Sequence, residues 1–256
     1  MRPRPPRWVV AVAGGVYLFL HLPLLVLMVF SFNASRFGVS WTGFTLDWYR
    51  RLLERDDILL GLRRSLLVGL ATALVATVLG TLIAVALGRR RFRGRSGVEA
   101  FLYLPIVTPE IVVGISLLML FATVGVPLGL GTITIAHIAF GVAFVAVVVR
   151  ARLEGTDGSL EEAALTLGAD EITAFRTITL PLLAPGIVAG ALLAFTLSFD
   201  DYVITSFVAG AGSSTLPMVV YSMVRRGIEP SVNAISTIVI VMTAVLLWIA
   251  ERMARR

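Results

Sequence analysis

The sequence contains no lysine and no cysteine in 256 residues. Without lysine it can have no Walker A phosphate-binding loop, so this chain cannot be its own ATPase, and covalent catalysis through a lysine amine is excluded as well. Without cysteine it can have no disulfide, thiolate metal site or cysteine nucleophile. The two histidines, His21 and His137, lie in different apolar segments. We therefore expect each to make a buried polar contact between helices, and we expect no metal site.

Charge is also scarce. Charged residues make up 15% of the chain and hydrophobic residues 57%, whereas soluble domains carry about 25% charged residues. Apolar runs of 18 or more residues are typical of membrane helices, and open sheets cannot satisfy their backbone in lipid. The composition therefore predicts an all-α, multi-pass membrane protein. Six transmembrane helices are expected, at residues 8–32, 65–88, 101–124, 131–149, 182–208 and 234–251.

The first apolar run is too long for a signal-peptide core and has no small-residue cleavage pattern after it, so we interpret it as a retained helix. Residues 1–60 then comprise this helix and an external segment. In the second helix, small residues recur every fourth position from Thr72 to Gly88. Such a stripe predicts close packing against another helix.

All 22 basic residues are arginine, and the formal charge is +6. In a soluble protein this would suggest nucleic-acid binding, but here the arginines lie in loops and indicate topology, so no nucleic acid is expected. With both termini inside, the inner segments hold 14 arginines and the outer ones 8. This predicts that 33–64 is external and 151–181 cytoplasmic. The six arginines of 33–64, with Arg63 and Arg64 at a membrane boundary, oppose that assignment.

Residues 162–181 form a polar island between two long apolar segments. Ser159 is expected to cap a short helix with Glu162 as its capping-box partner, and Gly168 to end that helix in a left-handed conformation. Asp170 is expected to cap a second short helix, 171–177, which Pro181 closes off. The product would be a compact knob that fits a socket on a partner, although an ordinary amphipathic loop is the alternative.

Three carboxylates lie within the apolar segments. Glu110 follows two prolines, Pro105 and Pro109, near the middle of the third predicted helix, and a costly ionisable group there is a functional candidate. Asp200 and Asp201 lie toward the outer half of the fifth predicted helix. Adjacent helical positions point about 100° apart, so at most one faces a given path. We prefer Asp201, because it precedes Tyr202; the alternative is that both mark a helix end at the water boundary.

The polar island has the form E-A-A, three residues, G, nine residues, I-x-L-P, which resembles the EAA loop of permease subunits of ATP-binding-cassette (ABC) importers. In those permeases the loop receives work from a separate ATPase. The resemblance therefore implies an ATPase-coupling role for a set of residues in 159–181. They are Glu161, Glu162, Ala163, Ala164, Gly168, Ile178, Leu180 and Pro181.

Further segments, in order along the chain, resemble the permeases of spermidine/putrescine importers. They are 109–112, 198–202, 215–217, 221–224 and 230–234. The resemblance implies that 61–251 form a type I (MetI-like) permease domain in a bacterial inner membrane, in contact with lipid. It implies a second similar permease, two ATPases that hold ATP and magnesium, an external binding protein and a polyamine substrate. Carboxylates and aromatic faces suit a cation, and the residues that would supply them are Glu110, Asp200, Asp201, Tyr202 and Tyr221.

Other functions are considered as well. The same machinery could carry ferric iron, thiamine or a sugar. A stand-alone proton-coupled transporter would have no reason for the EAA-like loop, and the sequence shows no repeated half. An intramembrane enzyme would need a nucleophile–base pair or a metal cluster, and neither histidine has a suitable neighbour in sequence. The sequence leaves open which polyamine is carried and whether the substrate contacts this subunit.

Overall fold

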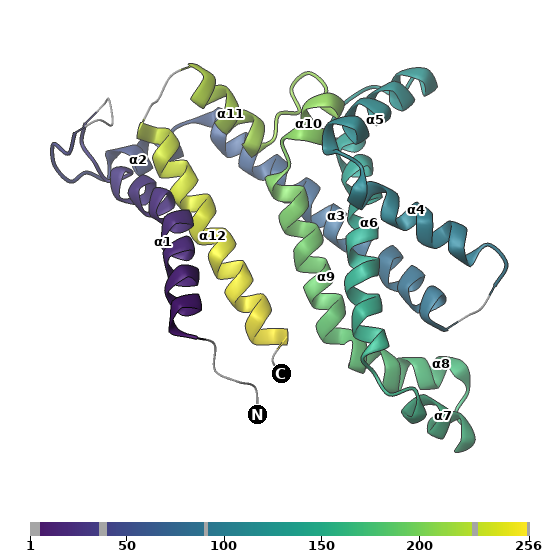
Figure 1. Ribbon diagram of the computed structural model, residues 1–256. Coiled ribbons are helices and arrows are strands. Elements are labelled where there is room, and N and C mark those ends of the chain that lie inside the picture. Colours follow the sequence, from purple (N-terminus) through teal and green to yellow (C-terminus); the bar gives the residue numbers. More distant parts are fainter. Residues whose placement is uncertain (1–5, 36–39, 90–91, 227–229, 255–256) are drawn as a thin grey trace. The chain divides into compact units, whose positions relative to one another are not determined.

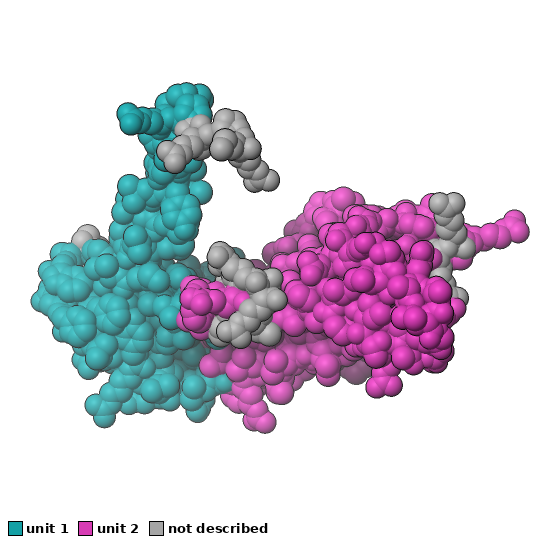
Figure 2. Space-filling model, turned by 90° about the horizontal axis from the view of Figure 1, so that it is seen from below, with its two compact units in different colours: residues 1–59, 220–242 teal, residues 60–219, 243–256 magenta. Residues whose placement is uncertain are grey.

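The computed structural model describes residues 6–35, 40–89, 92–226 and 230–254, and it is helical through most of these ranges (Figure 1). Extended pairing within them is limited to a bridge between Asn33 and Phe44. The all-α prediction is confirmed. The chain divides into two compact units, residues 1–59 with 220–242 and residues 60–219 with 243–256 (Figure 2). Each unit is described by itself below.

The first unit contains α1 (Arg7–Phe30) and α2 (Asp47–Leu53). α1 is apolar on all sides and has no buried residue, as expected of a helix surrounded by lipid. After α1, the indole N–H of Trp48 on α2 donates to the Asn33 carbonyl at 2.8 Å, and the Trp48 side chain is buried. His21 is exposed, stacks on Tyr17 and bonds the Tyr17 carbonyl one turn back. The prediction of a contact between helices was wrong for His21, because its own helix satisfies it.

The second unit is built on α3 (Asp56–Arg89), α6 (Leu130–Glu154) and α9 (Leu180–Asp200). α6 and α9 run side by side (Figure 1). The small-residue stripe of α3 is the face on which α6 packs. A Cβ atom added to Gly80 would lie 2.7 Å from Val145 Cβ and 2.9 Å from the Val142 carbonyl oxygen. The predicted close approach is confirmed, because there is no room for a larger side chain at Gly80.

The third predicted span is two helices, α4 (Arg95–Val107) and α5 (Glu110–Val124), which are bent by 111°. The break falls at Thr108 and Pro109, both in an extended conformation. A residue before proline is disfavoured in the α region, and proline cannot continue the ladder of N–H donors. The sequence analysis placed both prolines and Glu110 inside one helix, 101–124. Instead Glu110 begins a separate helix.

The fifth predicted span also differs. The chain is already helical in α8 (Glu171–Ala174), passes through a π-helical turn, η1 (Phe175–Thr179), and continues as α9. Pro181 therefore does not close a short helix. The Leu180 N–H bonds the Phe175 carbonyl, five residues back, and Pro181 follows in the first turn of α9, where proline is tolerated. After Asp200 the helix breaks, and the chain resumes as α10 (Val203–Val208).

Within the described residues, four helices are individually long and apolar enough to cross a membrane: α1, α3, α6 and the stretch Glu171–Asp200. The bent pair α4 and α5 adds a fifth crossing if it forms one span. α11 (Leu216–Arg226) and α12 (Pro230–Ala254) complete the described part of the chain, and α12 contains the sixth predicted span, 234–251. The multi-pass prediction is confirmed. By length and composition the described residues contain four or five crossings, so the predicted number of six is not confirmed.

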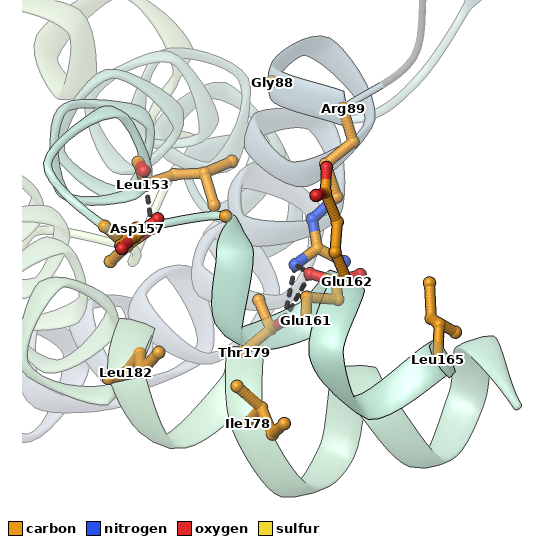
Figure 3. Close-up of a pocket in the computed structure, with 12 residues that line it drawn as sticks. Gly88, Arg89, Leu153, Asp157, Glu161, Glu162, Leu165, Ile178, Thr179 and Leu182 are labelled. Atoms are coloured by element: carbon orange, nitrogen blue, oxygen red, sulfur yellow. Dashed lines mark hydrogen bonds and ion pairs between the residues drawn. The ribbon is translucent and has the colours of Figure 1, made fainter. Parts of the chain in front are cut away.

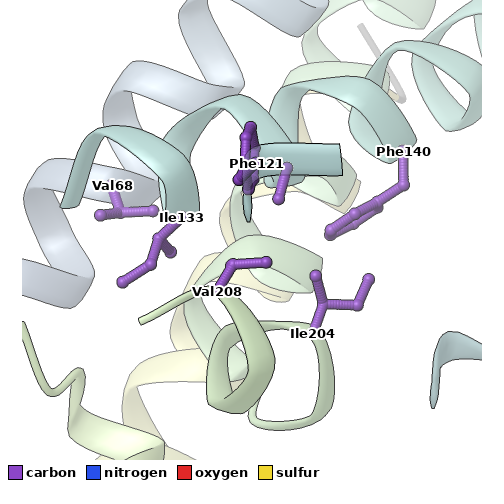
Figure 4. Packing of buried hydrophobic residues seen from close by; sticks show 7 residues of the cluster. Val68, Phe121, Ile133, Phe140, Ile204 and Val208 are labelled. Carbon is purple, nitrogen blue, oxygen red and sulfur yellow. The ribbon is translucent and has the colours of Figure 1, made fainter. Parts of the chain in front are cut away.

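A buried apolar cluster fixes the short helix α10. Val68 from α3, Phe121 from α5, Ile133 and Phe140 from α6, and Ile204 and Val208 from α10 pack together (Figure 4). The Thr132 hydroxyl adds a polar link by donating to the Val208 carbonyl at 2.8 Å. These contacts hold α5 and α10 against α6.

Candidate functional site

A cavity of about 360 Å³ lies where the two helix breaks meet. Four of the five residues predicted for a substrate path line it: Glu110, Asp200, Asp201 and Tyr202. They come from α5, from the end of α9 and from the link to α10, so residues about 90 positions apart are brought to one site. The fifth, Tyr221, belongs to the first unit, on α11, is exposed and does not line this cavity.

Glu110 and Asp200 are the exposed carboxylates of this cavity. Neither side chain has an ion pair or a hydrogen bond among the described residues. Glu110 lies in the first turn of α5, where a negative charge suits the helix dipole, but Asp200 is the last residue of α9, where it does not. Unpaired carboxylates within apolar segments are costly, so Glu110 and Asp200 are candidates for a functional site.

Asp201 has a different environment. Its Oδ2 atom accepts bonds from the Thr205 N–H and the Thr205 hydroxyl, both at 2.7 Å, and lies 3.2 Å from His137 Nε2. The Asp201 side chain is 6% exposed. The carboxylate therefore caps α10 and holds it to α6. The sequence favoured Asp201 over Asp200 as the residue that faces a substrate path; both line the cavity, and Asp200 is the exposed one.

His137 is fully buried and joins three helices. Its Nδ1 atom lies 2.7 Å from the Ser198 hydroxyl on α9, and its Nε2 atom faces Asp201 and Thr205. The predicted polar contact between helices is confirmed for His137. Sequence reasoning missed its pairing with Asp201, because 64 positions separate the two residues and no local pattern links them. It also missed the aromatic rings of Phe140 and Phe144, which line the cavity from α6.

The polar island folds into a knob. α7 (Ser159–Thr166) ends at Gly168, which has a φ of +95°, and Asp170 Oδ1 accepts the Thr173 N–H at 3.0 Å to start α8. Hydrogen bonds from the Thr173 side chain and backbone hold the pKa of Asp170 below its ordinary value. The two predicted turn residues, Gly168 and Asp170, are confirmed in their local conformations.

The start of α7 was predicted wrongly. Gly158 is the N-cap residue, and Ser159 lies inside the helix. The Ser159 N–H donates to Asp157 Oδ1 at 3.0 Å. The side-chain acceptor at the start of α7 is therefore Asp157, whereas the sequence analysis assigned that task to Ser159. The capping box between Ser159 and Glu162 is therefore not formed.

The knob has adjacent glutamates in different environments. Glu161 forms an ion pair with Arg89 and accepts the Thr179 hydroxyl at 2.9 Å, beside a cavity of about 360 Å³ (Figure 3). Glu162 is exposed and has no ion pair among the described residues. Ala163, Leu180 and Pro181 are exposed as well, whereas Ala164 and Ile178 are half-buried. Large apolar side chains also face outward, among them Leu165, Leu167 and Ile172. An exposed apolar surface beside a carboxylate suits a protein partner.

Residues 65–256 match the model of the family "binding-protein-dependent transport system inner membrane component". The chain belongs to this family. It is therefore a non-enzymatic transport subunit, a permease, that crosses the inner membrane more than once.

Two relatives of this permease come from Escherichia coli (strain K12). The spermidine/putrescine transport system permease protein PotC is 45% identical over 241 residues, which cover 94% of this chain and 91% of PotC. The putrescine transport system permease protein PotI is 43% identical over 253 residues, which cover 96% of this chain and 89% of PotI.

Solved structures show the fold. A chain of a bacterial ABC transporter for the acidic polysaccharide alginate has a TM-score of 0.73 at 18% identity, and the match covers 98% of this permease and 99% of that chain. A chain of the MetNI methionine transporter has a TM-score of 0.64 at 19% identity, covering 78% and 98%. The predicted type I permease fold is confirmed.

Proposed function

We propose that this permease imports polyamines such as spermidine and putrescine across the inner membrane. The observation that carries the proposal is the convergence of Glu110 and Asp200, two exposed and unpaired carboxylates, on one cavity between broken helices. Aromatic rings from Tyr202, Phe140 and Phe144 complete its lining. Ammonium groups that leave water are stabilised by carboxylates and aromatic faces. The names of the two relatives, one for spermidine and putrescine and one for putrescine, support the same substrate class.

The transport mechanism follows from the knob and the breaks. The permease would work by alternating access, together with a second similar permease, two ATPases that hold ATP and magnesium, and an external binding protein. The ATPases would push on 159–181, where Glu162 and the exposed leucines offer a contact surface. Because the cavity lies at two helix breaks, a small change in helix angle would open it to one side or the other. Substrate affinity must stay moderate, since a tightly held cation would not leave.

Uptake by the whole transporter tests the proposed function. The permease would be reconstituted in vesicles with a second permease, an ATPase and a binding protein of the same transport system. We expect uptake of radiolabelled putrescine or spermidine that requires ATP and the binding protein. Unlabelled polyamines should compete with it, whereas ferric iron, thiamine and sugars should not. A complex whose ATPase lacks its phosphate-binding lysine is the control. Competition by iron, thiamine or a sugar alone would contradict the polyamine assignment.

Topology gives a second prediction. The arginine distribution supports cytoplasmic termini, a cytoplasmic knob and an external segment 33–64. Arg64, one of the opposing arginines, donates to the Ser214 carbonyl at 3.3 Å and so has a structural role. Ser40 and Ser159 are exposed, and the chain has no native cysteine. An impermeant thiol reagent added outside cells should label Ser40→Cys and leave Ser159→Cys unlabelled until the membrane is opened. Labelling of position 159 alone would invert the model.

A further inference from the structure

Arg89 lies at the end of α3 and contacts two other elements of the permease. Its guanidinium forms an ion pair with Glu161 on α7 and donates to the hydroxyl of Thr179, the last residue of the π-helical turn before α9. It also lies over the Phe175 ring, 5.8 Å from the ring centroid. Thr179 in turn donates to Glu161 at 2.9 Å. Three side chains from three elements therefore form a closed triangle, whose polar contacts are visible in Figure 3.

α7 depends on such contacts for its position. None of its residues is buried, so no apolar face anchors it to the bundle. The Arg89 and Glu161 side chains, by contrast, are only 26% and 24% exposed, and Thr179 is buried. The charges also suit their helices, because Arg89 lies in the last turn of α3 and Glu161 in the first turn of α7.

We propose that Arg89, Glu161 and Thr179 form a clamp that transmits movement of the knob to α3 and α9 together. The proposal rests on the proposed function, in which ATPases push on the knob. With the clamp closed, a displacement of α7 pulls on the end of α3 and on the π-helical turn that begins α9. π-helical turns inside helices are frequent at functional sites. Without the clamp, α7 would move without drawing the end of α3 and the start of α9 with it. Arg89 is thus a positioning residue for coupling and has no contact with substrate.

The test measures coupling in the complete transporter in vesicles. For Arg89→Ala and Glu161→Gln, we expect the subunits to co-purify and ATP hydrolysis to continue, while substrate imported per ATP falls by roughly threefold to fivefold, the scale of one partly exposed ion pair. Arg93→Ala is the matched control, because Arg93 is an exposed arginine four positions further along. It removes the same charge and should leave the ratio unchanged.

Charge exchange separates coupling from folding. In Arg89→Glu/Glu161→Arg the Thr179 hydroxyl can still donate to one partner and accept from the other, so the triangle can re-form with its charges exchanged. Both helix dipoles oppose the exchanged charges. The unfavourable dipole interaction is similar in size to the favourable ion pair, so the exchange should restore only part of the coupling. We therefore expect the double variant to recover at least about half of the substrate imported per ATP that Arg89→Glu alone loses.

Two results would overturn the clamp. One is a wild-type ratio in both Arg89→Ala and Glu161→Gln. The other is a double variant no better than Arg89→Glu, and this result decides the matter even if the single variants fail to assemble. Failure of the polyamine proposal looks different. In that case the wild-type complex would not import labelled polyamine, and the clamp would be tested with whichever substrate does stimulate ATP-driven uptake.

Discussion

Removing the charge of Glu110 or Asp200 should reduce radiolabelled polyamine uptake by roughly 5- to 150-fold, because each lost ion contact in a partly desolvated path costs about 1–3 kcal/mol. Glu110→Gln and Asp200→Asn keep size and hydrogen bonding while removing the negative charge. Both side chains are exposed to the cavity and are unpaired among the described residues, so folding should be little affected. Uptake would be measured at equal amounts of assembled complex.

The neighbouring residue supplies the matched control. Asp201→Asn removes the same charge one position away, but this side chain caps α10 and faces His137. We expect its main effect on stability, a loss of about 1–3 kcal/mol from weakened buried hydrogen bonds, seen as a lower midpoint of thermal unfolding in detergent. Uptake per folded complex should fall less than in Asp200→Asn. Unchanged uptake in Glu110→Gln/Asp200→Asn would remove the electrostatic argument for a cation path and leave the substrate class to the relatives alone.

Gly168→Val should abolish most uptake while leaving membrane insertion intact. Gly168 has a φ of +95°, which costs a β-branched residue at least about 1–2 kcal/mol. A Cβ atom added there would meet nothing within 4 Å, so the expected effect comes from backbone conformation and involves no clash. The turn between α7 and α8 would change, and Glu162 would no longer be presented to the ATPase in its native orientation. Binding-protein-stimulated ATP hydrolysis and uptake are the measurements.

Gly168→Asn is the control for this prediction. Asparagine is similar in size to valine but tolerates positive φ far better. It should therefore retain much of the wild-type activity, whereas a purely steric role for Gly168 predicts equal loss in both variants. Wild-type ATP hydrolysis and uptake in Gly168→Val would show that the conformation of this turn does not matter for coupling.

The two sets of residues separate the tasks of the permease. In the proposed function, charge at the cavity would govern which substrate passes, and backbone shape at the knob would govern whether ATP is used for it. Asp200 illustrates the cost of the first task, because an unpaired carboxylate at a helix C-terminus is unfavourable for the isolated fold. A cationic substrate in the cavity would offset that cost during transport.

Features that depend on a few neighbouring residues were determined by the sequence itself. The membrane class followed from composition, and the packing face of α3 followed from the spacing of its small residues. At the knob, Gly168 and Asp170 took the expected turn and cap, because positive φ and helix capping are local preferences of those residue types. The absence of lysine excluded an ATPase before any fold was known.

Only the tertiary structure decided how distant residues combine. The 111° bend at Pro109 and the continuous helix through Pro181 show that the same residue type can break a helix or be accommodated within it, according to the packing around it. The different environments of Asp200 and Asp201 follow from His137, which lies 64 positions from Asp201 and contacts only that one of the two carboxylates. The partner of Glu161 lies 72 positions away, at Arg89. Such pairs form because packed helices bring their faces together, and no preference of a short segment encodes which faces will meet.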